Sequence, residues 1–377
     1  MKKRSYTPYL ILLLCFCMLL AGCNSKDSTE QPSDTDQAQE TTNTPTTKED
    51  DPVTPPENQY KNLWEYKTEA DGVTAREVTI KTQKGGDPLE IIQITDLHFN
   101  YCTEEDLKDP VLKSTYENRK WLRIDYANNK RGSLDNALRC LEYAKNADQL
   151  VVTGDILDYL SQGTLDLTKK HIFDAFPNVM ACLGNHDAVR QMQGTVAENT
   201  TLEERMEILK SAWIHDADYY SKVLDERVML IQMNNASDPS QKYGCFWDHQ
   251  VEPLKNDLAL AREKGYTVLL FYHIPLATGN PADYSITASM VGDKNGSVRN
   301  LYTQGVGKLS SGASKEVYNL ITNNADIIGG AFCGHTHNDF YTEIKAKNAD
   351  GTDAVIPQYV LMGVPYGKGN ILRITVE

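Results

Sequence analysis

Five short polar clusters follow one another in a fixed order along the chain. They are Asp96-Leu97-His98, Gly154-Asp155-Ile156-Leu157-Asp158, Gly184-Asn185-His186-Asp187, a single His273, and Gly334-His335-Thr336-His337. Five of the eight histidines fall inside them. Imidazole and carboxylate groups together suit Zn, Mn or Fe, whereas a calcium site is built almost wholly from oxygen. The clusters therefore predict a site for divalent metal ions and metal-assisted hydrolysis.

Most of these clusters end an apolar run that is typical of a buried strand. Residues 89–94 lead into Asp96, 150–152 into Gly154, and 178–183 into Gly184. In an open α/β sheet, ligands bind where loops leave the carboxyl ends of the strands. We therefore expect each cluster to lie at the carboxyl end of a strand.

The spacing inside the clusters also favours convergence. Asp96 and His98 lie at i and i+2, so an extended backbone would point both side chains to one side, and the same holds for His335 and His337. A glycine precedes a candidate ligand in three clusters, where it allows the backbone to approach a metal without a Cβ clash.

The remaining pattern predicts an α/β fold in a single domain over residues 61–377. Helical spacing covers residues 134–147, 165–176, 201–213, 251–264 and 315–323, and further strand-like runs cover 228–233, 266–272, 326–332, 340–345, 357–362 and 370–376. Alternating strands and helices followed by late strands predict two packed sheets flanked by helices.

The five clusters together resemble the calcineurin-like metallophosphoesterase superfamily. Its signature, D-x-H, G-D-x-x-D, G-N-H-[DE], H and G-H-x-H, is present in full and in order between Ile91 and Asn338. The resemblance implies an α/β/β/α sandwich that holds two divalent metal ions (Mn, Fe or Zn). It assigns Asp96, His98 and His337 to the first metal, Asp155 to both, and Asn185, His273 and His335 to the second.

The same resemblance implies a reaction and roles for two further residues. A hydroxide shared by the two metals would attack phosphorus in a phosphomonoester or phosphodiester substrate. His186 would contact the substrate phosphate or protonate the leaving oxygen, and Asp158 would orient His186 or a ligand histidine. The motifs leave the choice between monoester and diester open. We interpret Asp187 as a cap or a structural brace rather than a catalytic residue.

Two inserted segments are predicted to form the walls of the substrate pocket, namely Phe99–Ser133 and Ala277–Ser314. The first carries several basic residues. Our hypothesis is that Arg119 and Arg123 contact an anionic substrate group, with a solvated helix face as the alternative.

The first 23 residues predict a secretory signal. Three basic residues precede an apolar run of about 13 residues, which is too short for a spanning helix of about 20 residues. Leu20-Ala21-Gly22-Cys23 resembles a bacterial lipobox, which implies lipid attachment at Cys23 and a location on the extracytoplasmic side of the cell membrane. An uncleaved anchor and an ordinary signal peptide with a chance cysteine are the alternatives.

Residues 24–60 predict a disordered acidic tether, because they contain nine acidic residues, two lysines and almost no aliphatic side chains. The net charge of −14 also argues against non-specific nucleic-acid binding, which needs a basic face. Cys182 and Cys333 lie in strand-like runs and are predicted core residues, while a disulfide between Cys102 and Cys140 is left open.

Three functions compete at this point. The first is a membrane-anchored dinuclear-metal phosphoesterase. The second is a non-catalytic surface lipoprotein that binds metal or a phosphorylated ligand, and the third uses the same metals on a carboxylic or thioester bond. A site that had lost catalysis would be expected to lack ligands or His186, and all are present. The sequence therefore favours the enzyme.

Overall fold

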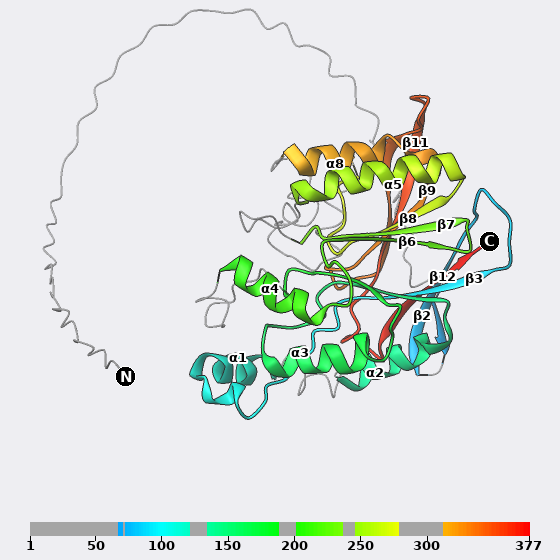
Figure 1. Cartoon of the computed structure of the whole chain (residues 1–377). Helices are drawn as coiled ribbons and strands as arrows, with labels where there is room; N and C mark the ends of the chain where they lie inside the picture. Colours follow the sequence, from blue (N-terminus) through cyan, green and yellow to red (C-terminus); the bar gives the residue numbers. More distant parts are fainter. Residues whose placement is uncertain (1–66, 71, 121–133, 188–200, 237–245, 279–311) are drawn as a thin grey trace, which may run out of the picture. The chain divides into compact units, whose positions relative to one another are not determined.

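Two six-stranded sheets form the framework of the computed structural model, which describes residues 67–70, 72–120, 134–187, 201–236, 246–278 and 312–377 (Figure 1). The first sheet has the order β1 (Lys67–Ala70), β2 (Val73–Ile80), β12 (Asn370–Val376), β3 (Leu89–Ile94), β4 (Gln149–Thr153) and β5 (Met180–Cys182). The second has the order β10 (Phe340–Lys347), β11 (Asp353–Val360), β9 (Ile328–Cys333), β8 (Thr267–Phe271), β7 (Val228–Met233) and β6 (Tyr219–Leu224).

Each sheet contains a run of neighbouring parallel strands. In the first sheet these are β3, β4 and β5, and in the second they are β7, β8, β9 and β11. Parallel neighbours bring their carboxyl ends to the same edge, which is the edge where the polar clusters emerge.

Strand side chains alternate between two apolar environments. In β4, Leu150 and Val152 pack in one cluster with helix side chains, whereas Val151 packs between the two sheets. In β8, Val268 and Leu270 face helices, whereas Leu269 faces the other sheet. This alternation has the period of two expected of a strand that is buried on both faces.

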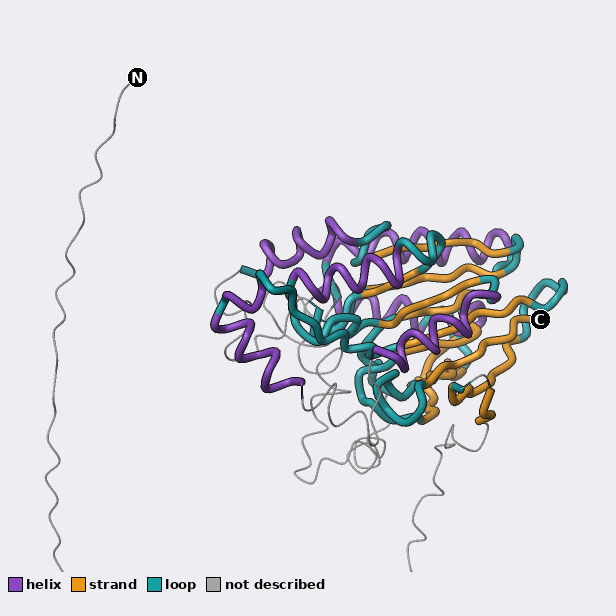
Figure 2. The backbone as a smooth tube through the Cα atoms, turned by 90° about the horizontal axis from the view of Figure 1, so that it is seen from below, coloured by secondary structure: helices purple, strands orange, loops and turns teal. Residues whose placement is uncertain are grey.

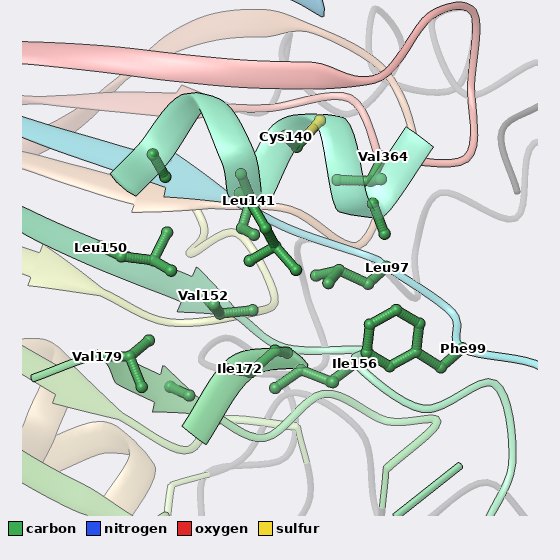
Figure 3. Close-up of a cluster of buried hydrophobic side chains, with 14 of the residues drawn as sticks. Leu97, Phe99, Cys140, Leu141, Leu150, Val152, Ile156, Ile172, Val179 and Val364 are labelled. Atoms are coloured by element: carbon green, nitrogen blue, oxygen red, sulfur yellow. The ribbon is translucent and has the colours of Figure 1, made fainter. Parts of the chain in front are cut away.

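Helices cover the outer faces of both sheets (Figure 1), and Figure 2 views the molecule from below. The first sheet packs against α2 (Leu134–Tyr143), the turn at Lys169–Phe173 and α4 (Leu202–Ala212), and Figure 3 shows part of this cluster, including Leu141, Leu150 and Ile172. The second sheet packs against α5 (Val251–Lys264) and α8 (Gly312–Thr322). The predicted α/β/β/α sandwich is therefore confirmed.

The helices begin and end at residues that suit those positions. Helix α4 starts after Thr201, whose hydroxyl accepts the Glu204 N–H while the Glu204 carboxylate accepts the Thr201 N–H. Helix α5 buries Val251, Leu254, Leu258 and Ala261, and ends at Gly265 in the left-handed conformation with φ of 69°.

The structure differs from the sequence prediction at several elements. The predicted helix 165–176 is α3 (Gln162–Thr168) followed by a π-helical turn over Lys169–Phe173, and β1, β2 and β6 were not predicted. The inserted segment Phe99–Ser133 contains a 3-10 turn (Asp106–Lys108) and α1 (Pro110–Lys120), and its remainder from residue 121 lies outside the described residues.

Four cysteines lie in the described part of the chain. Cys182 and Cys333 are buried in the core as predicted, and Cys102 and Cys140 are free thiols, so they form no disulfide.

In the described part of the chain no helix combines the length and the apolar character that crossing a bilayer requires. The predicted signal, Cys23 and the tether 24–60 lie outside the described residues, as does most of Ala277–Ser314.

Candidate metal centre

The five clusters meet at the carboxyl ends of β3, β4, β5, β8 and β9, so both sheets contribute to one site. Neighbouring loops are joined by backbone hydrogen bonds. Asp96 N–H donates to the Gly154 carbonyl at 3.0 Å, and Gly334 N–H donates to the His273 carbonyl at 3.0 Å. The prediction that the clusters lie at the carboxyl ends of strands is confirmed, and these ends come from both sheets.

The backbone that presents the ligands is not extended. Positive φ angles occur at Asp96 (51°), His98 (49°), Asp155 (49°), His335 (70°) and His337 (57°). Residues other than glycine rarely adopt this left-handed region, and each such residue costs on the order of 1–3 kcal/mol. The i, i+2 side chains therefore converge because the backbone bends at each ligand, and our prediction of an extended backbone was wrong.

One group of candidate ligands consists of Asp96, His98, Asp155 and His337, whose ligand atoms all lie within 4.8 Å of one another. His98 Nε2 lies 3.0 Å from His337 Nε2, and His337 Nε2 lies 3.0 Å from Asp96 Oδ1. Asp96 Oδ1 is buried and faces Nε2 of His337 at 3.0 Å and Nε2 of His98 at 3.7 Å. A carboxylate oxygen that is buried in this way and faces two imidazole nitrogens has the chemistry of a metal ligand.

A second group consists of Asp155, His273 and His335, and Asn185 adjoins it. His273 Nε2 lies 3.3 Å from Asp155 Oδ1, 3.2 Å from Asn185 Oδ1 and 3.2 Å from His335 Nδ1. Asp155 directs Oδ1 to this group, and its Oδ2 lies 3.7 Å from His98 Nε2 in the first group. The donors present thus fit two cations that share one carboxylate.

Two glycines leave room for this arrangement. A Cβ at Gly334 would lie 2.0 Å from Thr95 Oγ1 and 2.4 Å from Asp96 Oδ2, and one at Gly184 would lie 2.2 Å from Asp155 Oδ1. Gly154 has a φ of 81°, which matches the sharp turn predicted there. All three predicted glycine positions therefore exclude larger residues.

Electrostatics keeps the two central carboxyl groups ionised. Burial opposes ionisation of Asp96, but His337, His98 and His273 hold its pKa well below the usual value. Burial likewise opposes ionisation of Asp155, and His273, His186 and His98 lower its pKa. Both side chains are therefore in the form that binds a cation.

Asp187 braces two of the loops, as interpreted from the sequence. Its carboxylate accepts the Leu157 N–H at 2.8 Å and the Gly184 N–H at 2.7 Å. Burial and the nearby charge of Asp155 raise the pKa of Asp187 to about 7.

His186 lies beside the first group. Its Nδ1 is 2.8 Å from the backbone carbonyl of Asp158, to which it donates, and its ring meets the ring of His98 edge-on with centroids 4.6 Å apart. The Asp158 carboxylate lies 3.1 Å from His98 Nδ1 and 3.5 Å from His186 Nδ1. Asp158 therefore lies at the Nδ1 side of both histidines, which is the arrangement expected of a residue that orients them.

Arg119 pairs with Asp158. Its Nε and Nη2 both donate to the carboxylate of Asp158, and the arginine side chain is only 10% exposed. A guanidinium that donates two hydrogen bonds to a buried carboxylate supports that carboxylate, and the predicted contact of Arg119 with a substrate anion stays a prediction. Arg123 lies outside the described residues, so its predicted contact with substrate stays a prediction.

Sequence reasoning missed two neighbours of the ligands. Thr95 Oγ1 donates to Asp96 Oδ2 at 2.8 Å, and Tyr366 Oη contacts His337 Nδ1. Thr95 directly precedes the first cluster, so its position offered a signal. Tyr366 follows β11 and lies 29 residues from His337, and no sequence pattern pointed to it.

The calcineurin-like phosphoesterase family matches residues 89–339, a range that includes all five clusters. The chain belongs to this family. Members of this family hydrolyse phosphoric esters with a dinuclear divalent metal centre. No curated protein sequence matches the chain significantly.

Several solved structures are similar in fold. A purple acid phosphatase, PPD1, from yellow lupin (Lupinus luteus) seeds is 11% identical with a TM-score of 0.44, and the match covers 78% of this chain and 47% of that chain. The structure of PhoD is 11% identical with a TM-score of 0.42, over 78% of this chain and 59% of that chain. A dimetal phosphatase from Danio rerio is 12% identical with a TM-score of 0.37, over 77% of this chain and 99% of that chain. The match thus spans less than half of the lupin phosphatase chain.

Proposed function

We propose that this protein is a dinuclear-metal phosphoesterase that hydrolyses phosphomonoesters or phosphodiesters. The observation that carries the proposal is the gathering of two ligand groups around the shared Asp155. Asp96, His98 and His337 would hold the first cation with Asp155. Asn185, His273 and His335 would complete the second.

The chemistry divides between the cations and the chain. When bound, two divalent ions would supply Lewis acidity, which lowers the pKa of water and neutralises charge on phosphoryl oxygens. His186 has its Nδ1 directed at the Asp158 carbonyl, which sets the opposite nitrogen, Nε2, as the group that would contact the phosphate or hold a proton for the leaving oxygen. Asp158, paired with Arg119, would keep His98 and His186 in place.

Hydrolysis of p-nitrophenyl phosphate and bis-p-nitrophenyl phosphate tests this function. The purified full chain would be assayed after metal removal and again with added Mn²⁺ or Zn²⁺, with metal content measured in parallel. Asp155→Asn is expected to lose bound metal, and His186→Ala is expected to keep metal but lose about 100-fold or more in kcat. His249→Ala is the control, because that imidazole lies outside the clusters and is half-exposed.

The preferred ester would decide between monoesterase and diesterase. Two bound metals without turnover of either ester would favour the binding lipoprotein over the enzyme. Absence of bound metal in the wild-type protein would contradict the dinuclear-metal phosphoesterase.

We also propose that the protein is anchored to the extracytoplasmic side of the membrane through a lipid on Cys23, a proposal supported by the sequence alone. Metabolic labelling with a radioactive fatty acid and detergent phase partitioning test this. Cys23→Ser is expected to abolish labelling and release the protein from the membrane fraction. Labelling that persists in this variant would rule out attachment at Cys23.

A further inference from the structure

A segment beyond the five clusters packs directly on the metal centre. It covers residues 361–369 between β11 and β12, and it lies outside the range that the family matches. Val364 N–H donates to the Thr95 carbonyl at 3.1 Å, and a Cβ at Gly363 would lie 2.9 Å from the Cβ of Asp96. This segment, here called the β11–β12 loop, therefore forms one wall around the first group of ligands.

Tyr366 is the side chain of this loop that reaches a ligand. Its hydroxyl contacts Nδ1 of His337, and the two rings are tilted by 44° with centroids 5.1 Å apart. The other nitrogen of His337, Nε2, is the one that lies 3.0 Å from Asp96 Oδ1 and 3.0 Å from His98 Nε2. Tyr366 thus meets His337 on the side opposite the candidate metal position.

This contact bears on which nitrogen of His337 carries the proton. A neutral imidazole presents a lone pair at Nε2 only when the proton resides on Nδ1. In that tautomer Nδ1–H donates to the Tyr366 oxygen. A hydrogen bond of this kind to the distal nitrogen is the usual way in which proteins orient a ligand histidine.

Buried contacts hold the β11–β12 loop in this position. Asn370 Nδ2 donates to the carbonyls of Gly363 and Tyr366, both at 2.8 Å. Arg76 donates to Asn370 Oδ1 at 2.7 Å and pairs with Asp339, and the side chains of Arg76 and Asp339 are fully buried. These contacts connect the β11–β12 loop to Arg76 in β2 and to Asp339, which lies two residues after the last cluster.

We infer that Tyr366 is a positioning residue for the first metal, holding His337 with its proton on Nδ1 and Nε2 directed at the cation. This role rests on the proposed function, in which His337 is a ligand. Removal of the hydroxyl alone is expected to weaken binding at the first metal position by about 10-fold or more, the effect typical of a lost partner behind a ligand histidine. The second position, which His337 does not serve, is expected to change little.

Metal titration of Tyr366→Phe tests the inference. The stripped full chain would be titrated with Zn²⁺ against a chromophoric chelator, and with Co²⁺ while the visible absorption of each site is recorded. Tyr219→Phe is the matched control, since it removes a half-buried hydroxyl that donates to Asp257 at 2.7 Å between β6 and α5. Thermal unfolding of the stripped proteins would show that both variants fold.

The outcomes separate this inference from the proposed function. A wild-type protein that binds two Co²⁺ ions, with one site weakened and its spectrum altered only in Tyr366→Phe, supports the positioning role. Two sites with wild-type affinity and spectrum in Tyr366→Phe would overturn that role and leave the phosphoesterase intact. A wild-type protein that binds no Co²⁺ would instead overturn the proposed function.

Discussion

At the scale of single residues, Asp96 and His98 of the first group are held by hydrogen bonds to the atoms that face away from His337. Asp96 Oδ2 accepts hydrogen bonds from Thr95 Oγ1 and from the His335 N–H, which leaves Oδ1 directed at His337. His98 is held at Nδ1 by Asp158. Contacts of this kind fix the rotamer of a ligand and raise its affinity for a cation. These hydrogen bonds therefore hold the ligand side chains in place from within the chain.

Gly334→Ala tests how tightly this support is packed. The new Cβ would lie within 2.4 Å of Thr95 Oγ1 and Asp96 Oδ2, and both neighbours are buried, so the loop would have to shift. We expect a loss of about 1–3 kcal/mol in the free energy of unfolding, measured by urea denaturation, together with weaker metal binding. Gly85→Ala is the control, since no atom lies within 4 Å of its added Cβ, and it should change stability by no more than about 1 kcal/mol. Equal effects of the two substitutions would contradict the packing argument.

At the scale of elements, helix α1 connects the inserted segment to the metal centre through Arg119. The helix carries this arginine in its last turn, and the guanidinium reaches Asp158 at the end of the cluster that follows β4. Both side chains are largely removed from water, so neither charge is well solvated without the other. The insertion therefore supports the site as well as forming part of its surroundings.

Arg119→Met is expected to destabilise the protein and to loosen His98. Breaking a buried pair by removing one partner costs about 3–5 kcal/mol, because it leaves the other charge uncompensated. We expect that loss in urea denaturation and about 10-fold weaker binding of the first metal. Arg119→Lys should recover only part of both, since an ammonium group cannot make the two-pronged contact. The control Lys108→Ala removes an exposed pair with Glu105 and should cost less than about 1 kcal/mol. Wild-type metal affinity in Arg119→Met would show that α1 does not support the centre.

The sequence predicted those elements that are long and periodic, and the fixed order of the five clusters predicted the site. Helix α5 and strand β7 were predicted nearly to the residue, and the clusters lie together as expected. Strand β2 was missed because its pattern includes the buried, charged Arg76, whose partners Asp339 and Asn370 are more than 260 residues away. The left-handed backbone at Asp96 and the contact between Tyr366 and His337 likewise depend on tertiary packing, which no local pattern encodes.

At the scale of the whole molecule, the candidate metal centre lies where the two sheets meet. The clusters after β3, β4 and β5 come from the first sheet, and those after β8 and β9 come from the second. Apolar side chains such as Ile91, Val151 and Leu269 already join the sheets through their inner faces. Cations bound by Asp155 together with His273 and His98 would add a second connection between the same two layers.

Metal removal should therefore lower the thermal stability of the whole domain. A ligand that binds only the folded state stabilises it by about 2.7 kcal/mol at 100 times its Kd, and two cations would contribute about twice that. At roughly 2 °C for each kcal/mol in a domain of this size, the stripped protein should unfold about 10 °C lower than protein with Mn²⁺ or Zn²⁺ restored, as measured by calorimetry. In Asp155→Asn most of this metal-dependent rise should vanish, because both sites lose their shared ligand, whereas Asp166→Asn, which alters an exposed carboxylate on α3, should keep it. A Tm that stays constant across all metal concentrations in the wild-type protein would show that the cations do not connect the sheets.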